Sequence, residues 1–409
     1  MPPRSKLRQL EPLGVGGFRL LFLSTLGSSI GTLLAAIALA IDIKNRTNSG
    51  LWVGAVLIVQ FLPTIFIGLV LGPLLDRLER RKLMIVADLV RAAVFAALPF
   101  ASSAGEIVAL AGVAGLATGF FRPAVYAGVP NLVPDELLPD ANALLQTVEN
   151  VSWAAGPVLG GLLTAAAGPD AAYWINAVSF LVSAALIARI PARMLQSATA
   201  LTRGHWRDLA DGFRTVLHSR PLLAVLIAWG IASLGIGGAN VAEIFLAKDT
   251  FHAGDFGYGL LYSSIGGGLV VGSFASSTVL ARFGTTRTYA GALLLMGIGF
   301  AGAAASPNVW VAAVCCVAGG IGDGMAIVCN ALLVQRGADD AMRGRALTLV
   351  MSLTYAATGI GEAVAGGLLH VGGPRWVWAG AAVAYGLAAF AGFAFAGDPV
   401  EKRVEVTAH

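Results

Sequence analysis

Long apolar stretches separated by short polar loops dominate this sequence, and each is long enough to cross a bilayer as an α-helix of roughly 20 residues. Strands are not expected, because lipid accepts only helices or closed barrels and these runs do not alternate as barrel strands do. The sequence therefore predicts an all-α membrane protein with twelve transmembrane helices. They are expected at about 18–42, 51–75, 83–101, 106–128, 141–167, 171–189, 222–247, 256–280, 287–305, 308–334, 345–370 and 375–397.

The charge content agrees with a chain that lies in lipid. Charged residues make up 12% of it, about half the share found in soluble proteins. The pI of about 9.1 could indicate nucleic acid as a partner, but most of the Lys and Arg residues fall in alternate loops and in the tails. This asymmetry is the positive-inside pattern. It predicts a multi-pass protein of the cell membrane with both termini in the cytoplasm, and no nucleic-acid partner.

Short motifs recur about half a chain apart, which indicates two related halves. Three pairs share nearly the same offset: Gly160-Gly161-Leu162-Leu163 with Gly366-Gly367-Leu368-Leu369, Asp135-Glu136 with Asp339-Asp340, and Gly168-Pro169 with Gly373-Pro374. We therefore expect two pseudo-symmetric six-helix bundles, an arrangement in which transporters bind substrate between the halves. The predicted boundaries are 1–189 for the first bundle, 190–221 for a cytoplasmic linker, and 222–409 for the second bundle with a short tail.

The sequence lacks the motifs that would indicate ATP hydrolysis or a zinc or redox site. The pattern GxxxxGK[ST] is absent, so ATP hydrolysis by this chain is not expected, although a separate ATPase subunit stays open. Cys315, Cys316 and Cys329 match no zinc or redox motif. We predict a protein that is not an enzyme and that holds no cofactor or metal. Coupling to an ion gradient would then use carboxylates inside the membrane.

A charged loop follows the second apolar stretch and contains Gly72, Leu74, Asp76, Arg77, Arg80 and Arg81. It resembles the GxLxDRxGR[RK] signature of the major facilitator superfamily, with Glu79 where the family usually has Gly. Arginines in such a loop bind carboxylates or the carbonyls at helix ends. The resemblance implies a latch, formed by Gly72, Asp76, Arg77, Arg80 and Arg81, that stabilises one conformation.

The fifth stretch contains Gly156-Pro157-Val158-Leu159-Gly160-Gly161. The motif resembles the GPxxGG core found in exporters that exchange substrate for protons. Its small residues allow close packing and its proline bends the helix. The alternative is ordinary small-residue packing in a chain with 52 glycines. Gly156, Pro157, Gly160 and Gly161 are the antiporter-like candidates.

Further motifs narrow the resemblance to one branch of that superfamily. Phe121-Arg122-Pro123-Ala124, Val133-Pro134-Asp135-Glu136-Leu137 and Arg343-Gly344-Arg345 are similar to the branch that includes siderophore exporters and macrolide or multidrug efflux proteins. The resemblance covers the whole chain. It implies transport of a drug, siderophore or metabolite that is small and hydrophobic or amphipathic.

Carboxylates inside the predicted spans are the candidates for proton coupling, because each costs about 2.5–3.5 kcal/mol in hydrocarbon unless it is paired or hydrated. The candidates are Asp323, Glu149, Asp42, Glu243 and Glu362. The resemblance places the first, fourth, seventh and tenth helices around the cavity, which makes Asp323 in the tenth the foremost candidate. A polar stripe on the first helix, Thr25, Ser28, Ser29 and Thr32, could line the same path.

Two further charged pairs are expected. Arg122 and Glu149 lie at similar depths in adjacent spans, since each helical residue rises 1.5 Å. They are therefore predicted to form a buried pair, the alternative being an arginine that faces the cavity alone. Asp88 and Arg91 are i,i+3 neighbours on one helix and can neutralise each other locally.

These observations predict a secondary transporter that exports a small hydrophobic or amphipathic molecule, with protons and membrane lipid as its other partners. A proton-coupled nutrient uptake symporter is the main alternative. A membrane sensor or scaffold without transport is a third, and it predicts no continuous cavity between the halves.

Overall fold

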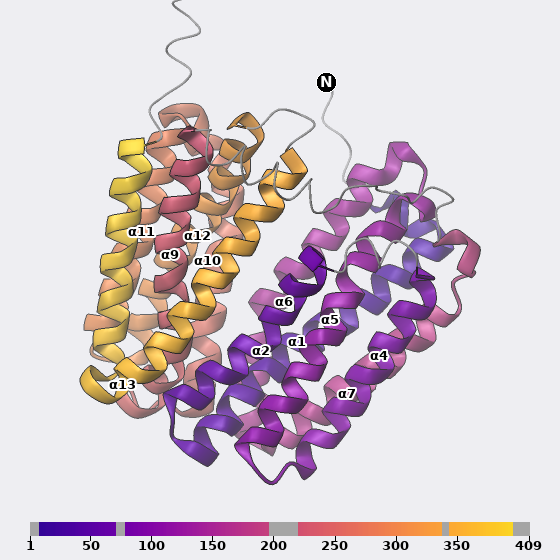
Figure 1. Cartoon of the computed structure of the whole chain (residues 1–409), viewed down its shortest axis with the longest axis horizontal. Helices are drawn as coiled ribbons and strands as arrows, with labels where there is room; N and C mark the ends of the chain where they lie inside the picture. Colours follow the sequence, from indigo (N-terminus) through magenta and orange to yellow (C-terminus); the bar gives the residue numbers. More distant parts are fainter. Residues whose placement is uncertain (1–7, 71–77, 196–219, 338–342, 396–409) are drawn as a thin grey trace, which may run out of the picture. The chain divides into compact units, whose positions relative to one another are not determined.

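The computed structural model of the protein describes residues 8–70, 78–195, 220–337 and 343–395. Within these ranges the chain consists of helices joined by short loops, and no residue there lies in a β-strand. The all-α class predicted from the long apolar runs is confirmed (Figure 1).

The helices before residue 196 follow the first six predicted spans. They are α1 (Gly16–Thr47), α2 (Gly50–Val70), α4 (Arg80–Ala97), α5 (Ala104–Leu132), α6 (Leu138–Ala167) and α7 (Pro169–Ala188). Short 3₁₀ helices join or precede them: η1 (Arg8–Gly14), η2 (Leu98–Phe100), η3 (Asp135–Leu137) and η4 (Ala192–Met194).

The helices after residue 219 follow the remaining spans. They are α9 (Arg220–Phe245) with a π-helical turn η5 (Leu246–Thr250), α10 (Gly254–Phe283), α11 (Thr285–Ala305), α12 (Val309–Gly337) and α13 (Arg343–Phe395). By length and composition, nine helices of the described residues could cross a membrane, with α13 counted once. The twelve-helix count therefore requires α13 to be divided and α2 and α6 to be included.

The division of α13 lies at Gly373, whose φ of 75° and ψ of 176° are not helical. Glycine accepts positive φ without a steric cost, and proline is favoured at the first position of the helix that follows. Gly168, between α6 and α7, has nearly the same angles, φ 80° and ψ 170°, and is also followed by a proline. The repeated Gly-Pro pair thus makes the same turn in both halves of the chain.

Contacts between Cα atoms divide the chain into two compact units. Unit 1 comprises residues 1–203 and 252–263, and unit 2 comprises residues 204–251 and 264–409. The first turns of α10 therefore belong to unit 1 and the rest of that helix to unit 2. The boundaries predicted from the sequence, 1–189, 190–221 and 222–409, stay a prediction.

The core of unit 1 lies where α1, α4, α5 and α7 meet. Phe18, Leu21, Met84 and Ile187 are fully buried there, and Phe121 of α5 packs with them. Bulky apolar residues also point outward, as on α7, where Trp174, Ile175, Val178, Leu181 and Val182 are each about half exposed. Apolar side chains on both sides of a helix are typical of a helix that faces lipid.

Unit 2 holds α10 and α12 together through glycines spaced four residues apart on each helix. A Cβ atom added to Gly272 would lie 2.0 Å from the carbonyl oxygen of Ile321, and one added to Gly320 would lie 2.1 Å from that of Ile265. Gly268 and Gly324 make equally close approaches. Small residues at this spacing let two membrane helices touch through their backbones. Asp323 is therefore carried by a helix with little freedom to shift.

Candidate functional site

The loop motif is only partly within the described residues, since Gly72, Asp76 and Arg77 lie outside them. Arg80 and Arg81 begin α4. Arg80 Nη1 donates to the carbonyl oxygens of Ala127 (3.0 Å) and Leu195 (3.1 Å). Arg81 Nη2 donates to the carbonyl of Ala188, the last residue of α7. Cations are stabilising at helix C-termini, as at Ala188, and the two arginines join the start of α4 to α5, to the end of α7 and to Leu195.

The Gly-Pro motif of α6 is a packing surface with two faces. Cβ atoms added to Gly156 and Gly160 would lie 2.7 Å from Leu33 Cβ and 2.5 Å from the carbonyl oxygen of Leu34, both on α1. One added to Gly161 would instead lie 2.8 Å from the carbonyl of Asp255, in the first turn of α10. The motif therefore brings α6 into backbone contact with two other segments of unit 1.

An aromatic contact adjoins this surface. The rings of Trp153 on α6 and Tyr262 on α10 are stacked, 5.8 Å apart with an interplanar angle of 9°. Tyr262 also meets Tyr258 edge to face. Stacked pairs contribute about 0.5–1.5 kcal/mol beyond their buried area. The sequence reading did not single out these aromatics, because their contact depends on which faces of α6 and α10 meet.

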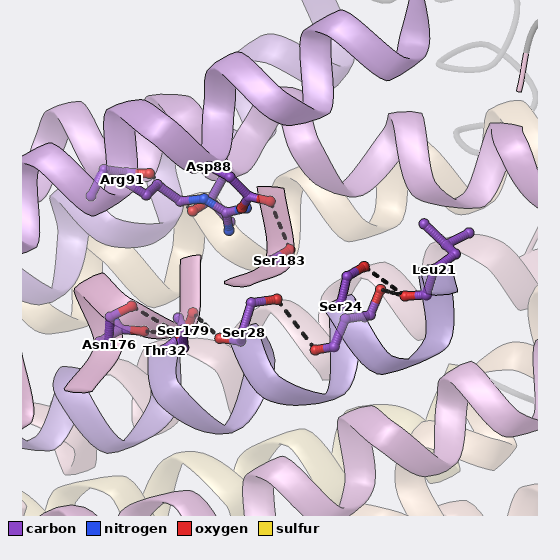
Figure 2. A network of polar contacts seen from close by, with 12 residues as sticks. Leu21, Ser24, Ser28, Thr32, Asp88, Arg91, Asn176, Ser179 and Ser183 are labelled. Carbon is purple, nitrogen blue, oxygen red and sulfur yellow. Dashed lines mark hydrogen bonds and ion pairs between the residues drawn. The ribbon is translucent and has the colours of Figure 1, made fainter. Parts of the chain in front are cut away.

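Both carboxylate oxygens of the buried Asp88 on α4 have hydrogen-bond partners. Arg91 Nη2 bonds Asp88 Oδ1, and the Ser183 hydroxyl donates to Asp88 Oδ2 over 2.7 Å. Figure 2 shows Ser183 directed from α7 toward Asp88. The Arg91 guanidinium also lies 4.2 Å and 4.3 Å from the ring centroids of Phe121 and Phe180, which favours the cation further. The structure therefore contains the local pair expected here, with partners from two more helices.

Three hydroxyls of the polar stripe of α1 are bonded within their own helix. Thr25 donates to the Leu21 carbonyl, Ser28 to that of Thr25, and Thr32 to that of Ser28, as Figure 2 shows for part of the series. Such back-bonding lets hydroxyls lie in an apolar surrounding without other partners. Ser28 is buried at 2% exposure, so it does not present an open polar surface.

Asp42 lies near the end of α1 and is fully engaged. Its Oδ1 accepts from Arg46 Nε at 2.7 Å and its Oδ2 from the Tyr173 hydroxyl at 3.1 Å. Arg46 also donates to the carbonyl of Ala101. These contacts tie α1, α7 and the segment after η2 together. Tyr173 is a partner that the sequence did not reveal.

Arg122 and Glu149 are in contact across α5 and α6. Arg122 Nη2 lies 2.6 Å from Glu149 Oε1, and the Tyr126 hydroxyl donates to the same oxygen at 2.8 Å. The two residues were expected to be buried, but the Arg122 side chain is 49% exposed and that of Glu149 24%. The expectation of burial is wrong because depth along a helix does not fix which side faces the protein interior.

The carboxylates of unit 2 are placed differently. Glu243 on α9 is 1% exposed, and its Oε1 has no hydrogen-bond partner in the described residues. Asp323 Oδ1 on α12 also lacks one there. Glu362 on α13, 3% exposed, accepts only a long bond of 3.4 Å from Asn240 Nδ2. None of the three forms an ion pair within the part of the chain that the structure describes.

The two units thus differ in how the acids within their helices are compensated. In unit 1 Asp42, Asp88 and Glu149 each contact an arginine and a hydroxyl-bearing side chain. In unit 2 Glu243 and Asp323 each hold an oxygen without a partner among the described residues. An ionised carboxylate without compensation costs several kcal/mol in an apolar surrounding. The acids of unit 2 are therefore the ones for which gain or loss of a proton changes the energy most.

Residues 8–408 match the family model described as "Transmembrane secretion effector". The chain belongs to this family of major facilitator superfamily transporters. It is a multi-pass membrane transporter, as the twelve predicted spans and the loop and Gly-Pro motifs indicated.

Curated relatives cover most of the chain. The multidrug efflux pump Tap of Mycobacterium tuberculosis is 27% identical over 378 residues, 87% of each protein. Macrolide efflux protein A of Streptococcus pyogenes is 22% identical over 351 residues, 82% of this chain and 85% of that protein.

Solved structures share the fold. A bacterial homologue of the iron transporter ferroportin, in an inward-facing state, has a TM-score of 0.74 at 16% identity and covers 96% of this chain and 100% of its own. The nucleoside transporter NupG has a TM-score of 0.73 at 14% identity, with 93% and 98% covered. At these identities the likeness concerns the fold alone.

Proposed function

We propose that this protein exports a small hydrophobic or amphipathic molecule from the cell in exchange for protons. Support for export comes from its relatives, which include a multidrug efflux pump and a macrolide efflux protein. Support for proton exchange comes from one observation, the carboxylates of unit 2 that hold a buried oxygen without a hydrogen-bond partner among the described residues, with Asp323 foremost. Substrate, protons and lipid are the partners in this proposal, and no catalytic step or cofactor takes part.

Asp323 is suited to carry the proton because of its position. It lies near the middle of α12, a helix of 29 residues, and its Oδ1 has no partner among the described residues. Closely packed glycines on both sides fix its helix against α10. Protonation would remove a charge that no ion pair among the described residues offsets, so the energy of one conformation changes relative to the other.

The remaining motif residues have further roles in this proposal. The segment Gly72 to Arg81 stabilises one state at the cytoplasmic side, and the Gly-Pro motif holds α6 against its neighbours. The two bundles, 1–189 and 222–409, rock about a central site while the linker 190–221 spans them. Both termini lie in the cytoplasm.

The test uses purified protein in vesicles, with radiolabelled erythromycin as the macrolide probe and ethidium as a second one. An antiporter accumulates the probe when the vesicle interior is acidic, and a symporter does so when the exterior is acidic. We expect accumulation with the acidic interior. Accumulation driven only by an acidic exterior would establish the uptake alternative, and no accumulation with either gradient or either probe would contradict both.

The residue assignment is tested in the same vesicles with Asp323→Asn. We expect the variant to lose gradient-driven accumulation but to keep exchange of labelled for unlabelled erythromycin, because exchange needs the site and the rocking motion but no net proton transfer. The matched control is Asp42→Asn, in which the replaced carboxylate is already paired with Arg46 and gradient-driven transport should continue. Unchanged accumulation in Asp323→Asn would remove this residue from the coupling role.

A further inference from the structure

A groove lies between α11 and the second helix of α13, entirely within unit 2, with a volume of about 710 Å³. Its lining is almost wholly apolar and contains mostly small residues, among them Gly297, Ala301, Ala382 and Gly386. Bulky side chains stand on its edges: Leu294, Ile298 and Val383 are 49%, 68% and 63% exposed. The groove is therefore open along the two helices, and the small residues at its base leave space for another molecule.

One end of the groove is polar. Arg375 lines it, with Nη1 donating to the Ala304 carbonyl at 2.7 Å and Nη2 to the Ser306 carbonyl at 2.8 Å. Its guanidinium also lies 5.5 Å from the ring centroid of Phe251. Within the described residues it forms no ion pair with a carboxylate. A guanidinium has five N–H donors, so donors remain after the two carbonyls are satisfied.

The length of the groove matches one leaflet. Arg375 and Gly386 are separated by about three helical turns, roughly 16 Å. The hydrocarbon of one leaflet is about 15 Å thick, half of the bilayer core. Trp376, which is 74% exposed, follows Arg375 directly, and tryptophan is enriched where membrane meets water. This length and this tryptophan predict that the arginine end lies at the interface and the glycine end near the midplane.

We infer that this groove is a phospholipid site, with one acyl chain along the small residues of α11 and α13 and the lipid phosphate on Arg375. The groove is apolar along its length and ends at a cation that has no carboxylate partner among the described residues. It is therefore complementary to an acyl chain that is attached to an anionic headgroup. Arginine binds phosphate through paired N–H donors. With the cytoplasmic termini proposed above, the lipid belongs to the outer leaflet.

The site is tested by photolabelling in phosphatidylcholine vesicles that contain a phosphatidylglycerol with a diazirine near the end of one acyl chain. Wild-type protein should be labelled in residues 294–305 and 375–386 more strongly than in 309–317, where α12 exposes Trp310, Val311 and Val314. A diacylglycerol with the same photoreactive chain has no phosphate and should label the groove about tenfold less, the cost of one charge-assisted hydrogen bond. Equal labelling by both lipids would overturn the assignment.

A substitution in the groove tests the site of the acyl chain separately from the phosphate contact. Gly386→Phe fills the groove, since a Cβ atom there meets nothing within 4 Å, and should abolish its labelling. The matched control is Gly367→Phe on the first helix of α13, away from the groove, where the added atom also meets nothing within 4 Å and labelling should persist. Unchanged labelling in Gly386→Phe would overturn the proposal.

The phosphate contact is probed with Arg375→Gln and Arg375→Lys. The glutamine variant should lose labelling by about tenfold, and the lysine variant should keep most of it because the charge remains. Gly386→Phe leaves Arg375 intact, so the chain site is tested even if Arg375→Gln does not fold. Equal labelling in a folded Arg375→Gln variant and in the wild type would show that the groove holds lipid without recognising its headgroup.

Discussion

At the scale of single residues, the contribution of an ion pair to stability depends on what surrounds it. Two i,i+3 ion pairs allow a comparison, one within α4 and one at its N-terminus, where Glu79 is the N-cap residue. Asp88 and Arg91 are buried beneath two aromatic rings and a serine hydroxyl. Glu79 and Lys82 form a pair of the same spacing at 2.7 Å, with the lysine side chain 77% exposed. The sequence spacing of the two pairs is identical, so spacing alone does not reveal that one pair is buried and the other exposed.

We expect Arg91→Ala to lower the free energy of unfolding by about 3–5 kcal/mol, because it leaves the Asp88 carboxylate buried without its cation. Lys82→Ala should cost no more than about 1 kcal/mol, as for other exposed pairs. The measurement is unfolding in mixed detergent micelles of increasing sodium dodecyl sulfate content.

A double variant checks the cause. Asp88→Asn with Arg91→Gln removes both charges and should be less destabilised than Arg91→Ala alone, because no unpaired ion remains. If the double variant unfolded as easily as the single one, the loss would come from packing rather than from the stranded charge.

At the scale of helices, close backbone approach decides which glycines matter. The sequence repeat pairs Gly160-Gly161 with Gly366-Gly367, as if all four were equivalent. A Cβ atom on Gly161 would lie 2.8 Å from the Asp255 carbonyl and 3.1 Å from Gly259 Cα, whereas one on Gly367 meets nothing within 4 Å. The repeated glycines therefore have different surroundings in the two halves.

Gly161→Ala should cost about 1–3 kcal/mol of stability, as overpacking does where only backbone atoms could yield. It should also lower erythromycin transport in vesicles, since α6 and the first turns of α10 would be forced apart. Gly367→Ala should be neutral or stabilising by up to about 1 kcal/mol, because alanine favours the helix. Equal effects of the two substitutions would show that the close approach at Gly161 is not what the motif needs.

At the scale of the whole molecule, the distribution of Lys and Arg predicts which loops face the cytoplasm. The helix order then places the ends of α6 and α11 outside and the starts of α6 and α11 inside. Single cysteines can report this if Cys315, Cys316 and Cys329 are first replaced by serine.

Cysteines at Ala167 and Pro307 should react with a membrane-impermeant maleimide in intact cells, because both lie at predicted external ends of helices. Cysteines at Glu136 and Arg282 should react only after the membrane is opened. All four residues are exposed, so reactivity reports the side of the membrane. Labelling of Glu136→Cys in intact cells would contradict the proposed orientation.

Much of the fold could be read from the chain because each membrane span must satisfy its own backbone hydrogen bonds, so length and hydropathy locate the helices. The repeated Gly-Pro pair also indicated the positions of the turns at Gly168 and Gly373, because glycine accepts positive φ and proline favours the start of a helix. The ends of the helices were predicted less well. Helix α1 extends to Thr47, past the predicted end at 42, because polar residues can continue a helix beyond the hydrocarbon.

The sequence alone determined that this protein crosses lipid as helices, that its halves share turn motifs, and which acids lie deep enough to be costly. Only the tertiary structure decided which of those acids are compensated, because Tyr173, Ser183 and Tyr126 come from other helices whose rotation no local pattern specifies. It also decided that Arg375 ends an apolar groove, since a groove exists only once two helices have packed side by side. Helix formation is local in lipid, whereas compensation of charge and the shape of a surface depend on which faces meet.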